Sequence, residues 1–575
     1  MYCDKHSQNR GRDMVETIDT LVEGGTYFVS EPSVVLRETS AGSGKLNHLL
    51  LGDWLKYIGP THVHEWKTRS GKSRSATYAF VQCRGDKGWL KIEEFDKDRA
   101  LEVNFVDIGQ GDGCHIVTPD DKVLLIDAGI SDNMERFLSW RYNLRGRNVE
   151  GAKDFDPTSF IKKPWKIDYV VMSHPDQDHY GGFEKIFKNP KLSFDKVYHN
   201  GIVERPKEQE QVGVEYDDDL GGKFSADGES YLYDYVTSAT ALRALVNRHP
   251  KTNKKLVKTF RALFKNTPKA KVKAVGVNMS SLNTPKSLDG FGEDQKFSLQ
   301  ILGPIRERKS FNGSPRTTLR ELGSEGVTKN GHSIIFKARY GHLKLLLGGD
   351  LNSQSQNFLL QRYADLDQTP EKIEKAISKL KAKPQPLNDK NQLELDELEQ
   401  KYVHLESVGE KTFGVDVAKA CHHGSQHILD SFIRSVNAVA TVISSGDNES
   451  HSHPRPDALG AYGRYGRGHR PLIFSTELAR STHEFTPQLT NYLALRGITL
   501  QIEAETDKRK KAALLATLES KRDRNVAVYG MITLRALGDK VIIAQKLEVA
   551  RSESQKWDIY ELHYDSKADH FSYSH

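Results

Sequence analysis

Four side chains that commonly bind metal ions lie between residues 174 and 179. His174, Asp176, Asp178 and His179 are followed by two glycines, and the run from Ile167 to Met172 before them is apolar and β-branched. Such a run predicts a buried strand, and side chains in the loop after a strand can converge on one point. Two imidazoles and two carboxylates at this spacing suit one or two divalent cations, because without a cation they would repel one another or stay unpaired. The alternative, a polar surface turn with hydrogen-bonded side chains, is disfavoured by the number of ligands.

The composition indicates a mostly globular chain. It has 575 residues, 28% charged and 9% aromatic, with a net charge of +6, which is enough for several domains and at least one large core. The four cysteines include no C-x-x-C pair, so we expect no disulfide framework and a reducing compartment. There is no apolar signal core, and no apolar run approaches the ~18–20 residues that cross a bilayer. We therefore expect a soluble, cytoplasmic protein with no membrane partner.

The first part of the chain predicts a small β domain. Residues 1–20 are polar and are expected to form a flexible arm, while residues 21–97 hold short apolar runs separated by Gly and Ser. This spacing is typical of a small β-barrel. The runs at Val34–Arg37, Leu51–Leu55 and Gly88–Leu90 resemble bacterial SH3-like domains. Such domains bind a protein or ligand partner in some proteins and act as spacers in others, and we expect their tryptophans in the core.

A second domain is expected from residue 98 to residue 575. It opens with a strand that leads into Asp107-Ile108-Gly109-Gln110-Gly111-Asp112, and a hairpin follows that ends at Asp127-Ala128-Gly129. A phosphate-binding loop is not indicated, because no Gly-Lys-Ser/Thr follows the glycines and the flanking segments are strands.

Further motifs follow the 174–179 loop in a fixed order. They are Asn330-Gly331-His332-Ser333, Gly348-Gly349-Asp350, His422-His423-Gly424-Ser425, and Ser444-Ser445-Gly446 with His453-Pro454. In this order the motifs resemble metallo-β-lactamase-fold hydrolases and, more narrowly, the nuclease-type domain of the ComEC competence proteins. Asp176 stands where the general fold has a second histidine, as in the ComEC branch. The resemblance implies an α/β fold, an αββα sandwich, with helical insertions and without the membrane-spanning part of ComEC.

The resemblance also implies a centre of two divalent ions, Zn²⁺ or Mn²⁺. Its ligands would be His174, Asp176 and His199 for one ion, and Asp178, His179 and either His422 or His453 for the other, with Asp350 bridging. Asp178 would orient the hydrolytic water, and His423 or His453 would protonate the leaving oxygen. The oxygen ligand at Asp176 makes manganese nearly as suitable as zinc. His199 follows a predicted strand, and a surface histidine is the alternative there.

Two insertions and a C-terminal extension interrupt or follow the predicted sandwich, near 203–292, 352–410 and 476–575. The first contains eleven Lys or Arg and no Asp or Glu between residues 241 and 273, with apolar residues at helical spacing. It is either the solvated face of a helical hairpin or a phosphate-tracking surface. In the second interpretation the nucleic-acid contacts are Lys251, Lys254, Lys255, Lys258 and Arg261. The 352–410 insertion predicts exposed helices with Glu and Lys at i,i+4. A hairpin around Gly538-Asp539 is expected to extend the second domain.

The sequence therefore predicts a metal-dependent phosphodiesterase or nuclease acting on nucleic acid, DNA rather than RNA. One alternative is a hydrolase of a small phosphodiester or other metabolite, for which the basic insertion has no role. The other is a non-catalytic metal-binding interaction protein, which the cost of keeping unused carboxylates close together disfavours. A fold resemblance alone does not decide between these functions.

Overall fold

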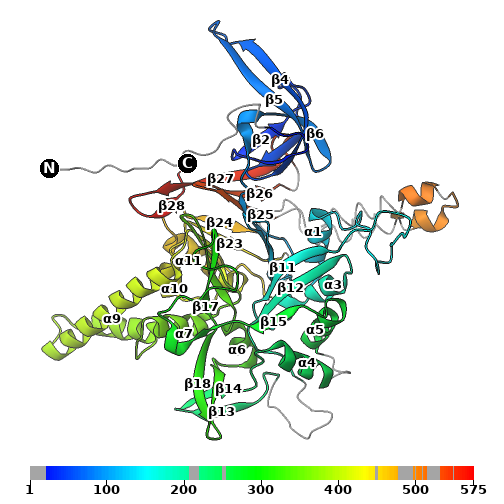
Figure 1. The fold of residues 1–575 in the computed structure, drawn as a ribbon. Coiled ribbons are helices and arrows are strands. Elements are labelled where there is room, and N and C mark those ends of the chain that lie inside the picture. Colours follow the sequence, from blue (N-terminus) through cyan, green and yellow to red (C-terminus); the bar gives the residue numbers. More distant parts are fainter. Residues whose placement is uncertain are drawn as a thin grey trace. The chain divides into compact units, whose positions relative to one another are not determined.

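The computed structural model describes residues 21–205, 219–248, 254–446, 451–476, 497–498, 500–507, 509–514, 531–547 and 550–574. The predicted arm of residues 1–20 lies outside these ranges. The chain forms two compact units (Figure 1). The smaller comprises Met1–Glu102, Thr118–Asp121 and Leu534–Glu561, and the larger comprises Val103–Val117, Lys122–Thr533 and Leu562–His575.

Most strands of the first sheet in the larger unit are largely buried on both faces, whereas the edge strand Lys271–Ala274 exposes its two lysines. The order of the sheet is β15-β12-β11-β10-β9-β8, and the bounds are β8 (Leu101–Phe105), β9 (Cys114–Val117), β10 (Val123–Ile126), β11 (Trp165–Met172), β12 (Leu192–His199) and β15 (Lys271–Ala274). The pairs β10–β11, β11–β12 and β12–β15 are parallel, whereas β9–β10 is antiparallel. Parallel strands covered on both faces have continuous apolar runs, which is the pattern of the run before His174.

The second sheet runs in the order β17-β20-β21-β22-β23-β24. The strands are β17 (Phe297–Gly303), β20 (Ile335–Tyr340), β21 (Leu343–Leu347), β22 (Val417–Lys419), β23 (Ala440–Ile443) and β24 (Leu472–Ser475). From β21 to β24 the pairs are parallel, so the carboxyl ends of β21, β22 and β23 lie at one edge. Helices accompany both sheets (Figure 1), and this arrangement confirms the predicted α/β class.

Helices pack beside each sheet. On the first sheet, α3 (Phe183–Lys188) packs against α5 (Lys255–Asn266) and β12. With α4 (Ala239–Arg248), α5 confirms the helices predicted for the first insertion. The 352–410 insertion forms α7 (Ser353–Tyr363), α8 (Pro370–Lys381) and α9 (Asp389–Phe413), as predicted. They are accompanied by α10 (Asp430–Val436) and α11 (Pro456–Tyr465).

A small third sheet was not predicted. Its order is β13-β14-β19-β18-β16, with β13 (Lys223–Ala226), β14 (Glu229–Leu232), β16 (Val277–Asn278), β18 (Ile305–Phe311) and β19 (Ser314–Arg320). It therefore combines strands from the predicted insertion with a hairpin that follows β17. The short helix α6 (Glu325–Gly331) then leads the chain back to β20.

The N-terminal part of the smaller unit is an all-β module, as predicted. Its main sheet has the order β6-β5-β4-β1-β7, with β1 (Thr26–Val29), β4 (Trp54–Lys67), β5 (Ser73–Cys83), β6 (Asp86–Lys91) and β7 (Phe95–Asp96); β2 (Ser33–Leu36) pairs with β3 (Asn47–Leu50). Val29, Leu36, Leu55 and Phe95 are fully buried in its core. The expectation that the tryptophans lie in the core is wrong for Trp54 and Trp66, whose side chains are 37% and 36% exposed.

The C-terminal strands correct the predicted domain plan. The hairpin around Gly538-Asp539 is present as β25 (Ile532–Leu537) and β26 (Lys540–Lys546), followed by β27 (Trp557–Asp565) and β28 (His570–Ser572). Residues 534–561, however, belong to the smaller unit, where Ile542 and Ala544 pack on Leu50 and Leu51. A chain that started near residue 98 would lose these partners and expose the apolar face of β26.

Two further findings concern membrane-spanning helices and cysteines. Among the helices of the described ranges, none combines the length and apolar character needed to cross a membrane. Cys83, Cys114 and Cys421 are buried free thiols, and Cys3 lies outside the described residues.

Candidate metal centre

Loops at the ends of four strands meet at the candidate centre. Asp127 follows β10, the 173–179 segment follows β11 and includes the short helix α2 (Gln177–Tyr180), Asp350 follows β21, and the His422–His423 turn follows β22. Glycine makes the close approach possible, because a Cβ on Gly349 would lie 2.6 Å from Ser333 Oγ and 2.9 Å from Ser173 Oγ. His422 and His423 both have left-handed backbone angles, with φ of 49° and 53°, a costly conformation that the surrounding packing must hold.

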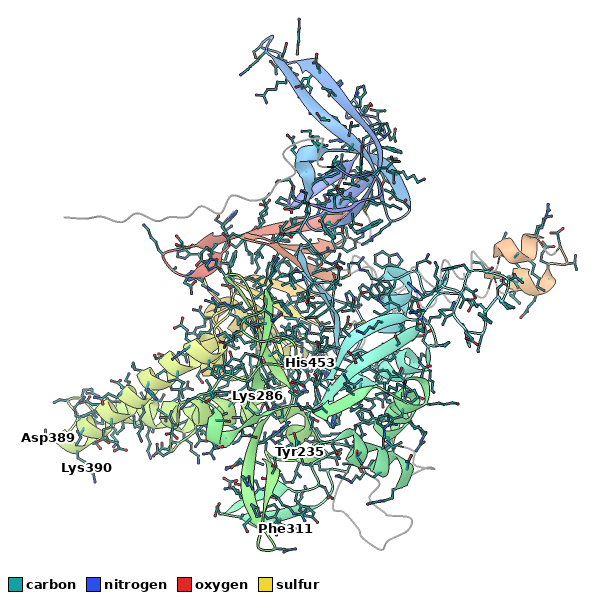
Figure 2. The ribbon with its side chains drawn as sticks, in the orientation of Figure 1. Tyr235, Lys286, Phe311, Asp389, Lys390 and His453 are labelled. Atoms are coloured by element: carbon teal, nitrogen blue, oxygen red, sulfur yellow. The ribbon has the colours of Figure 1, made fainter. Side chains whose placement is uncertain are left out.

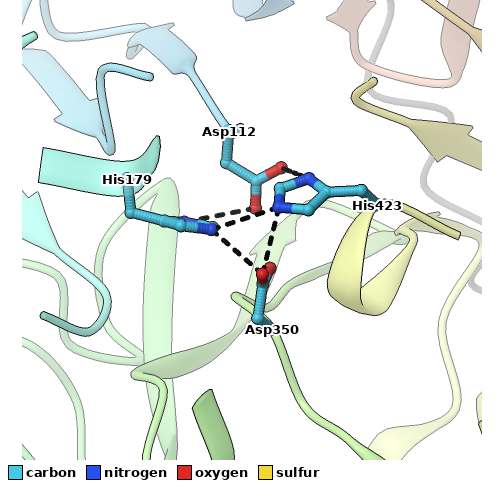
Figure 3. A group of neighbouring side chains, drawn as sticks. All are labelled: Asp112, His179, Asp350 and His423. Atoms are coloured by element: carbon cyan, nitrogen blue, oxygen red, sulfur yellow. Dashed lines mark hydrogen bonds and ion pairs between the residues drawn. The ribbon is translucent and has the colours of Figure 1, made fainter. Parts of the chain in front are cut away.

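One group of ligand atoms surrounds Asp350 Oδ2 (Figure 3). The Nε2 atoms of His179 and His423 lie 3.1 and 3.0 Å from this oxygen, and 3.3 Å from each other. Asp178 contributes one oxygen 3.9 Å from His179 Nε2 and the other 3.7 Å from His423 Nε2. Asp112, His179, Asp350 and His423 are all buried, and their ligand atoms lie within 4.8 Å of one another.

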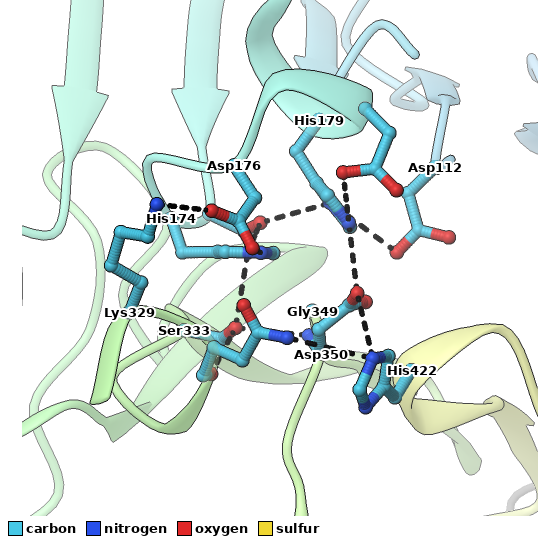
Figure 4. Close-up of polar contacts among 12 residues, drawn as sticks. Asp112, His174, Asp176, His179, Lys329, Ser333, Gly349, Asp350 and His422 are labelled. Carbon is cyan, nitrogen blue, oxygen red and sulfur yellow. Dashed lines mark hydrogen bonds and ion pairs between the residues drawn. The ribbon is translucent and has the colours of Figure 1, made fainter. Parts of the chain in front are cut away.

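A second group lies on the other side of Asp350 (Figure 4). His422 Nε2 is 4.0 Å from the same Oδ2 atom, and His174 Nε2 is 3.9 Å from Asp176 Oδ2. The other oxygen of Asp176 forms an ion pair of 2.8 Å with Lys329, which also contacts Glu204 at 3.3 Å. Asp350 therefore lies between two sets of nitrogen and oxygen ligands.

Hydrogen bonds at the outer nitrogens turn three imidazoles inward. His179 Nδ1 donates to Asp127 Oδ2 at 2.9 Å, and His423 Nδ1 donates to the Ser444 carbonyl oxygen at 3.0 Å. His174 Nδ1 lies 3.0 Å from the Ser173 hydroxyl oxygen. Because that hydroxyl donates to Asp127 Oδ2 at 2.6 Å, it accepts from His174. Each ring thus keeps its proton on Nδ1 and presents the Nε2 lone pair to the centre.

Burial and charged neighbours set the protonation of the side chains at the centre. Burial favours neutral rings, but Asp350 and Asp127 raise the pKa of His179 well above its usual value, and Asp350 and Asp112 do the same for His423. Although burial opposes ionisation, His179 and His423 hold the pKa of Asp350 well below its usual value. In the other group, burial and His179 lower the pKa of His174, and burial lowers that of His422 to about 4.

The donor set fits divalent metal ions. Inward-facing Nε2 lone pairs and carboxylate oxygens are all acceptors, so they cannot hydrogen-bond to one another without added protons. Asp350 Oδ1 and His422 Nδ1 are buried with no hydrogen-bond partner in the described part of the chain, which is costly for polar atoms. A mixed set of imidazole nitrogens and carboxylate oxygens suits Zn²⁺ and Mn²⁺.

The structure brings together most of the predicted ligands. His174, Asp176, Asp178, His179 and Asp350 lie around the centre, and their role as ligands stays a prediction. The His-His motif differs in one respect. His423, predicted as a proton donor, lies with His179, whereas Nε2 of the predicted ligand His422 lies 4.0 Å from Asp350 Oδ2. His453 is 9% exposed, and its ring centroid lies 5.7 Å from that of His422 (its position is labelled in Figure 2).

His199 is not brought into this group. Its Nδ1 accepts a hydrogen bond from the Gly201 backbone N–H at 3.1 Å, and its ring meets Phe260 edge-on with centroids 5.6 Å apart. Burial and the Arg306 guanidinium lower the pKa of His199 to about 3. The structure therefore places His199 against α5, with Nε2 buried and without a hydrogen-bond partner among the described residues, and its ligand role stays a prediction.

Three residues that support the ligands are absent from the predicted site. Asp127 orients His179, and Asp112 lies 3.2 Å from His423 Nδ1. Lys419 forms a buried ion pair with Asp112 and donates to the Gly349 carbonyl oxygen at 3.4 Å. Asp112 ends the first of the two motifs that open the second domain, and Asp127 begins the second. Their place in these motifs was the available signal for them.

The basic insertion is only partly open to a ligand. Lys254 forms an ion pair with Asp219, and Arg261 donates to the Val246 carbonyl oxygen at 3.3 Å. Lys255 is exposed and Lys258 half-buried, whereas Lys251 lies outside the described residues.

Comparisons with known proteins agree with the resemblance inferred from the motifs. Residues 114–263 match the family model of the Metallo-beta-lactamase superfamily. This segment runs from β9 into α5. It forms part of a metallo-β-lactamase-fold domain. It contains Asp127 and the 174–179 ligands, while Asp112, Asp350 and the His422–His423 turn lie outside it.

A partial similarity links the chain to ComE operon protein 3 of Bacillus subtilis (strain 168). The two are 32% identical over 111 residues, which is 19% of this chain and 14% of that protein. The chain therefore aligns with about one seventh of that relative's length. This similarity agrees with the narrower ComEC-type resemblance, whereas the SH3-like resemblance of residues 21–97 stays a prediction.

Proposed function

We propose that the chain is a metal-dependent hydrolase that cleaves phosphodiester bonds in nucleic acid. The observation that carries this proposal is the position of Asp350 Oδ2 between two ligand sets, 3.1 Å from His179 Nε2 and 4.0 Å from His422 Nε2. A carboxylate shared between two sets of ligands is the arrangement that a two-metal hydrolytic site needs.

Each ligand set would hold one divalent ion, Zn²⁺ or Mn²⁺. The first set is His179, His423 and Asp178, the second is His174, Asp176 and His422, and Asp350 is shared. When bound, the ions supply a water activated near neutral pH and positive charge for the phosphoryl oxygens.

Asp178 and His453 are the proposed catalytic side chains. Asp178 is 21% exposed at the mouth of the centre, where its carboxylate accepts a hydrogen bond from the attacking water and orients it. Of the two predicted proton donors, His423 has both nitrogens engaged, Nδ1 with Ser444 and Nε2 with Asp350. His453 therefore donates the proton to the leaving oxygen.

The nucleic-acid substrate, DNA rather than RNA, is supported mainly by the ComEC-type resemblance. The support from the basic insertion is smaller than the sequence predicts, because Lys254 and Arg261 already have partners within the chain. Lys255 and Lys258 remain available for phosphate contacts at α5.

Leaving-group dependence tests the proposal directly. The full chain, stripped of metal and reloaded with Zn²⁺ or Mn²⁺, is assayed on plasmid DNA, single-stranded DNA, RNA and bis(p-nitrophenyl) phosphate. Asp178→Asn should lower the turnover of every substrate by about 100-fold or more. His453→Gln should lower nucleic-acid cleavage by a similar factor but leave the nitrophenyl ester within about threefold, because nitrophenolate leaves without a proton.

Two outcomes would overturn the proposal. Turnover of the small ester without cleavage of any polymer would favour the metabolite hydrolase. Metal binding without turnover of either substrate would favour the non-catalytic interaction protein.

A further inference from the structure

The smaller unit carries a long two-stranded ribbon, formed by the outer halves of β4 and β5 (Figure 1). The strands pair from Thr61–Ala79 to Lys67–Ser73, beyond a register shift after Tyr57. The turn at its tip is ordered, since the Gly71 N–H donates to the Thr68 carbonyl oxygen at 2.8 Å and the Thr68 N–H to that of Lys72 at 2.9 Å. We define residues 61–79 as the ribbon.

The ribbon leaves apolar side chains without a packing layer. Leu55 and Val81, at the barrel end of the same strands, are fully buried, whereas Val63 is 51% and Trp66 36% exposed. An isolated two-stranded hairpin is only marginally stable in water. The outer halves of the two strands thus do not contribute to the core of the module. An exposed apolar surface of this kind is typical of a binding site.

The ribbon is also strongly basic. From Trp66 to Gly85 the sequence has no Asp or Glu, and four cations surround the tip: Lys67, Arg69, Lys72 and Arg74. All four are exposed, and none forms an ion pair with another described residue. Four unpaired like charges on so small a finger repel one another, and an anionic partner would remove that repulsion.

Aromatic rings and hydroxyls accompany the cations. The cross-strand pairs Trp66–Arg74, His64–Ala76 and His62–Tyr78 lie on one face. On that face His64 stacks on Trp66, with ring centroids 5.6 Å apart and planes 14° from parallel. The opposite strand and the tip contribute hydroxyls from Thr68, Ser70, Ser73, Ser75 and Thr77.

We propose that the ribbon is a nucleic-acid-binding element. Lys67, Arg69, Lys72 and Arg74 contact backbone phosphates together with the hydroxyls, and Trp66 provides a stacking surface. Lys, Arg, Ser and Thr are the residues that contact phosphate in such interfaces. A two-stranded ribbon fits the major groove of a duplex, and an exposed aromatic ring stacks on unpaired bases. The inference deepens the proposed function by naming a second contact with the same substrate, but it needs neither metal nor turnover.

The decisive measurement is binding of the full chain in the presence of a chelator. Fluorescence anisotropy with a labelled duplex and with the corresponding single strand gives affinity at several salt concentrations. Lys67→Gln/Arg69→Gln/Lys72→Gln/Arg74→Gln should flatten the slope of log affinity against log salt by about 3 units and weaken binding about 100-fold near 0.1 M salt. The oligonucleotide, duplex or single strand, whose affinity falls more in this variant is the preferred ligand.

A matched variant controls for net charge. Lys372→Gln/Lys375→Gln/Lys379→Gln/Lys390→Gln removes the same charge from α8 and α9, where acidic residues alternate with the lysines. This variant should bind within about threefold of the parent with an unchanged salt slope. Both variants should keep the parental melting temperature, because the altered side chains lie outside the barrel core.

Trp66→Ala separates stacking from charge. It should weaken single-strand binding about tenfold and leave the salt slope unchanged, because no charge is removed. The inference fails if the parent binds neither form, or if the four-site ribbon variant binds like the parent. It also fails if poly-glutamate displaces the oligonucleotide as well as an equally charged nucleic acid does, since an acidic protein would then be the partner. The binding assay contains no divalent metal, so it does not depend on hydrolysis. If the protein had no hydrolase activity but the four-site ribbon variant still lost binding, the ribbon proposal would be supported and the proposed hydrolase function would fail.

Discussion

The two halves of the candidate metal centre share Asp350 but are supported by different chemistry. On the His179–His423 side, a carboxylate accepts from His179 Nδ1, and a second carboxylate lies 3.2 Å from His423 Nδ1. On the His174–His422 side, His174 Nδ1 meets only the hydroxyls of Ser173 and Ser333, at 3.0 and 3.2 Å. His422 Nδ1 is buried there without a hydrogen-bond partner among the described residues.

The cations that accompany each half differ as well. Lys419, 6% exposed, pairs mainly with the outer carboxylate Asp112, and it approaches the ligand Asp350 only at 3.9 Å from Oδ1. Lys329 instead pairs at 2.8 Å with Asp176, which is itself a proposed ligand. A carboxylate behind an imidazole strengthens it as a ligand, whereas a cation on a ligand carboxylate weakens that ligand. We therefore expect the His179–His423 half to bind its ion more tightly.

Asp350→Asn should have the largest effect, because it acts on both halves. Neutralising the shared carboxylate removes a ligand from each ion, so activity should fall by about 1,000-fold or more. Metal content should fall from about two ions per chain to one or none, as measured by elemental analysis after dialysis. If two ions remained bound, Asp350 would not be shared and the comparison of halves would lose its basis.

Removing the buried Lys419–Asp112 ion pair should have the next largest effect, on the free energy of unfolding. Lys419→Met leaves a buried carboxylate without its cation and should lower the free energy of unfolding by about 3–5 kcal/mol, whereas Lys419→Met/Asp112→Leu should recover most of this loss. Denaturant unfolding in a chelator measures the difference without a contribution from bound metal.

Lys329→Met is the matched control on the other half. Its partners Asp176, Glu204 and Glu325 are 27%, 13% and 30% exposed. Each keeps more contact with water than Asp112, so a smaller loss of about 1–2 kcal/mol is expected. If Lys329→Met and Lys419→Met lowered the free energy of unfolding equally, the lysine of each half would contribute the same stability.

The sequence predicted the parts of this site that are local. The 174–179 ligands and Asp350 each follow an apolar strand, so their place at a sheet edge could be inferred from pattern alone. The Asp112–Lys419 pair could not, because it joins residues 307 positions apart whose approach depends on the order of strands in both sheets. The choice between His422 and His423 depends on left-handed backbone angles that no residue type in this turn indicates.

The same distinction applies to the fold. Apolar residues at helical spacing predicted α5, and Glu and Lys at i,i+4 predicted the helices of the 352–410 insertion, since both patterns are local. The partner of the C-terminal hairpin was missed because Ile542 packs on Leu50, and apolar residues do not specify which distant surface they cover. His199 was placed at the correct strand end, but its ring orientation follows from the Gly201 and Phe260 contacts.

A last pair of variants compares the metal affinities of the two halves directly, and one of them, Ser333→Ala, should have the smallest effect of all. Asp127→Asn replaces the acceptor at His179 Nδ1 and should weaken the tighter ion about 10–100-fold, which is the usual consequence of losing a carboxylate behind a metal-bound histidine. Ser333→Ala removes one of two hydroxyls at His174, and because Ser173 remains 3.0 Å away, the weaker ion should lose no more than about threefold. Competition with a chromogenic chelator resolves the two affinities in each variant. If Ser333→Ala weakened its ion as much as Asp127→Asn, hydroxyls would support a ligand as firmly as carboxylates here. The two halves would then differ in sequence but not in metal affinity.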